Sequence, residues 1–177
     1  MKHRIIWFLI GISAVGIVYG ALALNSVQQQ INEKSGQTVE VLDLRIDGYN
    51  AAEAYIALNA MGQEARTIYR NAEMSIDILY PISWALLLFS ITLLFSPKNS
   101  YRDILLAFPV VYLISDIAEN VHIISMIDGF PDNCGDGIFT VLKWMFALLS
   151  LVSVVLLIAY HFSCFAIEKI KARQRAR

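Results

Sequence analysis

Cysteine is scarce in this chain, which has two residues of that type among 177. Cys134 and Cys164 form no C-x-x-C pair, and this excludes the quinone-linked thiol oxidoreductases that also cross the membrane four times. Only Cys134 falls in a loop expected outside the membrane. The sequence therefore also lacks the paired loop cysteines on which a tetraspanin-like or claudin-like assignment would depend.

Charge is also sparse, at 16% of residues against roughly 25% in an average soluble domain. The net charge of −1 gives no electrostatic basis for binding nucleic acid. Long apolar runs are abundant instead. Roughly 20 apolar residues in a helix cross a hydrocarbon core about 30 Å thick, and four segments meet this length: 5–24, 75–95, 104–127 and 138–165. They predict one all-α membrane domain over 1–177, built as a bundle of four transmembrane helices.

The positive charges predict how this bundle is oriented. Lys2 and Arg4 precede the first span, Lys98 and Arg102 separate the second from the third, and a basic tail occupies 168–177. The other two connections are rich in acidic residues. Because Lys and Arg favour the cytoplasmic side, we expect both termini in the cytoplasm and the protein in the cell (plasma or inner) membrane.

The first span has two interpretations. A basic start followed by Ala21-Leu22-Ala23 resembles a secretory signal that is cleaved. The apolar run continues through Leu24, however, and Gly16 and Gly20 form a small-xxx-small pair suited to close helix packing. We expect a retained helix, with cleavage as the alternative.

The connection 25–74 is predicted to form an extracytoplasmic cap. The stretch 38–46 is rich in β-branched residues and predicts a short extended segment. Asn50, with Glu53 three residues later, predicts a helix start with a capping box. An amphipathic helix should follow, stop near Gly62 and resume toward the second span.

Polar residues inside the spans are the main functional signal, because ionisable groups in hydrocarbon must be paired, protonated or hydrated. In the third span, polar residues share one helical face: Tyr112, Asp116, Glu119 and Asn120. In the second span, the same spacing is shown by Glu73, Asp77, Tyr80 and Trp84. Depth along each helix places these groups in the outer half of the membrane. The candidate ligand-binding residues are Asp77, Tyr80, Tyr112, Asp116, Glu119, Asn120, His122 and Lys143.

Formal charge leaves two interpretations of this set open. Three acids, Asp77, Asp116 and Glu119, face one base, Lys143, so a carboxyl must stay protonated or a cation must enter. The set could be a structural lock between helices, or it could line a pocket that opens outward. His122 has no second histidine at ligand spacing, so no metal and no cofactor are predicted.

Several short motifs carry a resemblance. They are Leu42-Asp43-Leu44-Arg45, Gly48-Tyr49, Glu53-Ala54-Tyr55, Gly62-x-Glu64-x-Arg66, Asp77-x-x-Tyr80-Pro81 and Asp116-x-x-Glu119-Asn120. Together with Lys143, this pattern resembles a family of small bacterial four-span membrane proteins of unknown function. The resemblance implies a shared fold, and it draws attention to Arg45, Glu64 and Arg66 as residues that clamp the cap over the bundle.

Three functions fit these features. The first is a non-enzymatic module, either an accessory subunit or a binder of lipid or another amphiphile. The second is an intramembrane enzyme on a lipid-like substrate, with Asp116 or Glu119 as acid or base and Lys143 stabilising negative charge. The third is a proton or cation pathway. Expected partners are membrane lipids and a protein partner or second copy of the chain, with no nucleic acid.

Overall fold

The computed structural model describes residues 2–97 and 100–175, and these residues form helices and no β-strand. The elements are α1 (Lys2–Ser35), the 3-10 helix η1 (Leu42–Leu44), α2 (Ala51–Glu73), α3 (Ile76–Phe95), α4 (Ser100–Asp128) and α5 (Ile138–Arg175). The predicted all-α class is confirmed. Three helices are longer than their predicted spans: α1 continues past residue 24 to Ser35, α5 continues past residue 165 to Arg175, and α4 begins four residues before residue 104.

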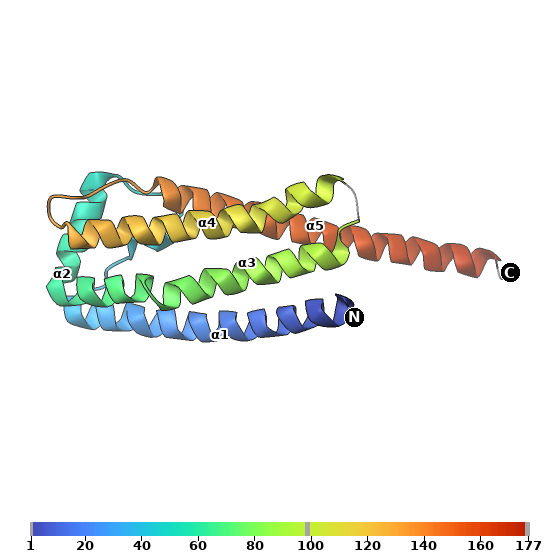
Figure 1. Cartoon of the computed structure of the whole chain (residues 1–177), viewed down its shortest axis with the longest axis horizontal. Coiled ribbons are helices and arrows are strands. Elements are labelled where there is room, and N and C mark those ends of the chain that lie inside the picture. Colours follow the sequence, from blue (N-terminus) through green and yellow to red (C-terminus); the bar gives the residue numbers. More distant parts are fainter. Residues whose placement is uncertain (1, 98–99, 176–177) are drawn as a thin grey trace.

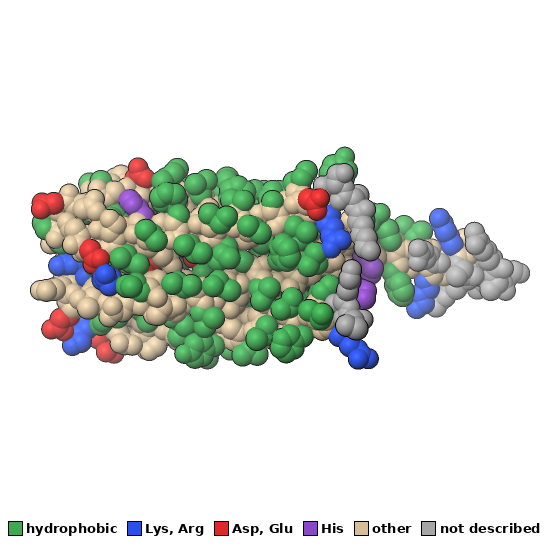
Figure 2. All heavy atoms as spheres, viewed as in Figure 1, with side chains coloured by type: hydrophobic (Ala, Val, Ile, Leu, Met, Phe, Trp, Pro, Cys, Tyr) green, Lys and Arg blue, Asp and Glu red, His purple; other side chains and the backbone are tan. Residues whose placement is uncertain are grey.

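Four of these helices, α1, α3, α4 and α5, contain segments long and apolar enough to cross a membrane. They lie side by side, with both chain termini at one end of the bundle and α2 at the other (Figure 1). Large apolar side chains cover the middle of the bundle (Figure 2), and many of them are exposed, such as Phe8, Val15, Leu148 and Leu156. An exposed apolar belt on this scale fits a small integral membrane protein, whose surface contacts lipid.

Small residues bring α1 and α3 close together. Ser13, Gly16 and Gly20 share one face of α1, and a β-carbon added at Gly16 would lie 2.3 Å from Ser83 Oγ on α3. One added at Gly20 would lie 2.7 Å from the ring of Tyr80. The small-xxx-small pair therefore sits at a helix interface, where the missing side chains allow the two backbones to approach.

The segment between α1 and α3 packs as a cap on one end of the bundle. Its fully buried side chains include Leu42 and Leu58, which share an apolar core with Ile31 of α1. Asn50 and Glu53 form the predicted capping box at the start of α2, and Gly62 interrupts that helix with a positive φ of 69°.

The prediction of an extended segment over 38–46 is only partly correct. Residues 38–41 have no regular structure, but Leu42–Leu44 form η1. The backbone N–H groups of Leu42 and Asp43 both donate to Tyr69 Oη, at 3.1 and 3.3 Å. With no neighbouring strand in the described residues to accept these hydrogen bonds, a side chain of α2 accepts them and the backbone turns.

The three predicted cap residues do not form one clamp. Glu64 pairs with Lys34 at 2.9 Å, and Arg45 lies 3.8 Å from Glu40. Arg66 donates to the Leu58 carbonyl oxygen at 2.8 Å and lies over the ring of Phe130. The cap is instead joined to α4 by Arg70, whose guanidinium donates twice to Asp128, at 2.5 and 2.8 Å.

Candidate functional site

Lys143 lies at the centre of one part of the site. Its ammonium group contacts Glu119 Oε2 and lies 3.5 Å from Asp116 Oδ1. All three side chains are buried, and Glu119 is fully so. Asp116 and Glu119 are three residues apart on α4, which puts both on the face toward α5. The single positive charge of Lys143 balances one of the two carboxylates, so one negative charge is left unbalanced.

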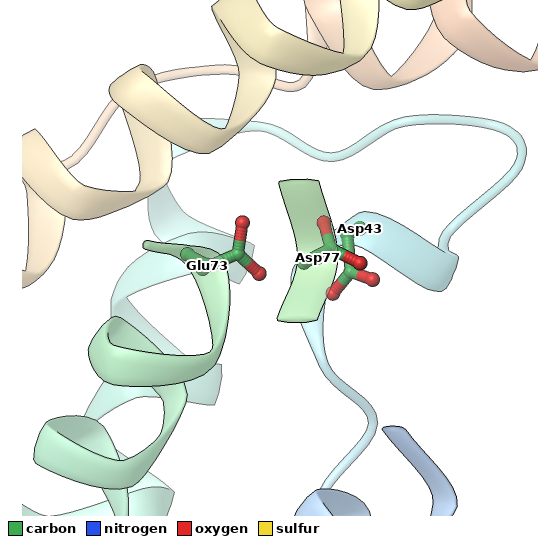
Figure 3. Close-up of side chains that lie close together, drawn as sticks. All are labelled: Asp43, Glu73 and Asp77. Carbon is green, nitrogen blue, oxygen red and sulfur yellow. The ribbon is translucent and has the colours of Figure 1, made fainter. Parts of the chain in front are cut away.

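Asp77 belongs to a different group of acids. One carboxylate oxygen each from Asp43, Glu73 and Asp77 lie within 4.8 Å of one another. Figure 3 shows the three side chains directed toward a common space, from η1, the last turn of α2 and the first turn of α3. Lys143 makes no ion pair with any of them among the described residues.

Hydrogen bonds from other elements fix Asp43 in this group. Tyr69 Oη donates to Asp43 Oδ1 at 2.7 Å, and the indole N–H of Trp144 donates to the Asp43 carbonyl oxygen at 3.1 Å. The 3-10 turn is therefore held between α2 and α5. Its carboxylate is directed toward the interior of the protein.

Asn120 fixes the other two acids through their backbone. Its side-chain amide donates to the carbonyl oxygens of Asp77, at 3.2 Å, and Glu73, at 3.4 Å. Those carbonyls lie where α2 ends and α3 begins, at a break in the helix around Ser75. Asn120 thus donates to the Glu73 carbonyl oxygen at the helix break and to the Asp77 carbonyl oxygen, which has no donor within the helix because Pro81, four residues later, lacks an N–H.

A cavity of about 360 Å³ extends from these acids into the bundle. Its polar end is formed by Asp43, Asp77, Asp116 and Lys143. Its remaining wall is aromatic or aliphatic and includes Tyr80, Trp84, Leu88, Tyr112, Trp144, Ala147, Leu148 and Leu151.

The cavity opens on the side of the bundle. Leu44, Leu148 and Leu151 line it and are also about half exposed or more, at 51%, 61% and 49%. These leucines lie on η1 and α5, and Leu24 of α1 lines the same cavity. In a membrane this opening would face lipid rather than water.

The predicted site residues thus divide into three sets. Asp77, Tyr80, Tyr112, Asp116 and Lys143 line the cavity, whereas Glu119 and Asn120 lie behind it and hold the lining residues in place. His122 is elsewhere: its Nε2 lies 3.1 Å from the Asp136 carbonyl oxygen, in the connection between α4 and α5. The structure therefore does not bring His122 to the cavity.

Sequence reasoning missed the role of Asp43. That residue comes 34 positions before Asp77 in a segment predicted to be extended, and no periodic pattern links the two. Glu73 did carry a signal, since it precedes Asp77 by four residues. Its value as a partner of Asp77 depends on the helix break at Ser75, which spacing alone did not reveal.

Five buried carboxyl groups therefore share this region with one lysine. Several of their oxygens are buried with no hydrogen-bond partner in the described residues, namely Glu73 Oε2, Asp77 Oδ2, Asp116 Oδ2 and Glu119 Oε1. Buried acceptors are costly unless they receive a proton or a cation. These oxygens could accept a proton, a hydrogen-bond donor or a cation.

Comparison of the chain with protein-family models, curated proteins and solved structures finds no match.

Proposed function

We propose that this protein binds a membrane amphiphile, with the headgroup at the acidic end of the cavity and the apolar portion along α5. The observation that supports this is the division of the cavity wall into a charged end and an apolar remainder that opens sideways. A lipid could enter from the bilayer without its chain crossing a polar surface. The volume of about 360 Å³ fits a headgroup with the first part of a chain.

The lining favours a headgroup that donates hydrogen bonds. Asp43, Asp77 and Asp116 present carboxylate oxygens, and only Lys143 among the charged lining residues is a donor. A primary ammonium group offers three donors and a positive charge. Phosphatidylethanolamine and phosphatidylcholine differ mainly in this respect, because the choline nitrogen has no N–H. We therefore expect the ethanolamine lipid to be preferred.

Filling the cavity should abolish this binding. Ala147 lines the cavity on α5, so Ala147→Trp places an indole where the lipid would lie. Native mass spectrometry of the protein released from mixed micelles should show bound phosphatidylethanolamine on the wild type, and at least about a tenfold lower occupancy on the variant, a loss of about 1.4 kcal/mol of binding free energy.

Val152→Trp is the matched control for this experiment. Val152 lies on the same helix, is 46% exposed and is not among the residues that line the cavity. Its variant should keep wild-type occupancy. The proposal is wrong if the wild type retains neither lipid, or if both tryptophan variants lose lipid equally.

We further propose that both termini are cytoplasmic and that the cap and the acidic end of the cavity lie outside the cell membrane. The two termini lie at the same end of the bundle (Figure 1), and the basic residues near them support this orientation by the positive-inside rule. On this view the headgroup comes from the outer leaflet.

Cysteine labelling tests the orientation. Cys134 lies in the connection at the cap end and Cys164 near the other end of α5, and both are free and partly exposed. In intact cells, a membrane-impermeant maleimide should label the Cys164→Ala variant through Cys134. The Cys134→Ala variant should be labelled only after permeabilisation. The reverse pattern would place the termini outside.

The other functions stay predictions. An acid/base reaction by Asp116 or Glu119 with Lys143, a proton or cation pathway, and a role as an accessory subunit have no specific observation that favours them over amphiphile binding.

A further inference from the structure

We propose that Asp43, Glu73 and Asp77 bind one divalent cation of the calcium type, between the cap and the bundle (Figure 3). Carboxylate oxygens are the preferred ligands of such hard cations. Oxygens on opposite sides of a Ca²⁺ ion, each at about 2.4 Å, are separated by about 4.8 Å. The three carboxylate oxygens all lie within 4.8 Å of one another, so a point between them lies no more than about 2.8 Å from each, close to the 2.3–2.6 Å of Ca²⁺–oxygen contacts.

Buried oxygens with no hydrogen-bond partner, in this group and on Asn120 beside it, also point to a ligand. Asn120, from α4, is 3% exposed, and its Oδ1 has no hydrogen-bond partner. Its amide nitrogen donates to the carbonyl oxygens of Glu73 and Asp77, so the unpartnered oxygen belongs to the amide group that contacts the backbone of these two acids. Glu73 Oε2 and Asp77 Oδ2 are also buried without a donor.

The protein supplies no cation of its own to this group. Among the described residues, no Lys or Arg nitrogen lies within 4.0 Å of the three carboxylates, and Lys143 is engaged by Glu119 and Asp116. Burying several like charges together without a counter-ion is strongly unfavourable. A bound divalent ion would remove most of this charge.

A second cavity provides a route for the ion. It has a volume of about 200 Å³ and is lined by Asn25 and Gln28 as well as by Asp43, Glu73 and Asp77. Asn25 is exposed at the surface of α1. Apolar side chains such as Leu24, Val27 and Ile31 also line this cavity, and Asn25 and Gln28 supply polar groups along it between the surface and the acids.

Binding should tie three elements together, since the acids come from η1, the last turn of α2 and the first turn of α3. The purified full-length protein in detergent, stripped with EDTA, is titrated with Mn²⁺ and free Mn²⁺ is measured by electron paramagnetic resonance. We expect one saturable site, and we expect Ca²⁺ to compete for it and to raise the Tm above that in NaCl of equal ionic strength.

The Glu73→Gln/Asp77→Asn double variant should weaken Mn²⁺ binding roughly tenfold or more and lose the Ca²⁺-dependent rise in Tm. Its control is Asp132→Asn/Asp136→Asn, which removes two acids from the connection between α4 and α5 and should bind like the wild type. The proposal is overturned if the wild type shows no saturable Mn²⁺ binding and no rise in Tm with Ca²⁺. It is also overturned if the two double variants bind Mn²⁺ with the same affinity.

A double variant that failed to fold would leave the wild-type titration and Tm as the deciding measurements. The Ala147→Trp variant does not touch these three acids, so it should keep the cation site. Because Asp43 and Asp77 line both cavities, the lipid experiment is done on protein stripped with EDTA, and failure of lipid binding can then be told apart from failure of cation binding.

Discussion

Replacing Lys143 with methionine should lower the free energy of unfolding by about 3–5 kcal/mol. The physical reason is that Asp116 and Glu119 would remain in the protein interior without the ammonium group that now contacts both. Methionine has a similar length and packs well, so the loss would reflect charge rather than volume. Unfolding by SDS, followed by circular dichroism at one detergent composition, measures the difference.

Two companion variants show which acid matters. Glu119→Gln combined with Lys143→Met removes both members of the shorter contact and should recover part of the loss, because only Asp116 then remains buried without the ammonium group. Asp116→Asn alone should cost much less than Lys143→Met, since Lys143 keeps its contact with the fully buried Glu119. If Lys143→Met is as stable as the wild type, the ion pair is not a structural lock.

Replacing Gly16 with leucine should be the second most damaging change, lowering the free energy of unfolding by about 2–3 kcal/mol. Even a β-carbon at this position would lie 2.3 Å from Ser83 Oγ and 3.1 Å from Ser83 Cβ. Ser83 cannot simply move aside, because it is buried and its hydroxyl donates to the Leu79 carbonyl oxygen at 2.8 Å. The two helices would have to separate along their length.

Gly11→Leu is the control for this prediction. Gly11 lies on the same helix, and a β-carbon there meets nothing within 4 Å. Its variant should match the wild type or exceed it slightly, since leucine is the better helix former. The same SDS titration compares the two. Equal losses from both substitutions would mean that close α1–α3 packing does not limit stability.

The sequence by itself determined the number of spans and much of their local detail. Apolar length identified the four helices that are long and apolar enough to cross a membrane, because the bilayer imposes one minimum length on every span. Local rules also placed the capping box at Asn50 and the interruption of α2 at Gly62, since both depend on residues within a single turn. Helical spacing put Asp116 and Glu119 on one face, and the structure then brought Lys143 to them.

Only the tertiary structure decided which polar groups share a site. Asp77 and Lys143 line one cavity, and the break near Ser75 and the η1 turn also place Asp77 with Glu73 and Asp43. Periodicity cannot foresee this, because it describes one helix at a time and the acids come from three elements. His122 shows the converse: it occupies the same helix as Asp116 and Glu119, yet it faces the connection to α5. Composition determines that a chain enters the membrane, whereas the location of its buried charges depends on how its turns fold back on the bundle.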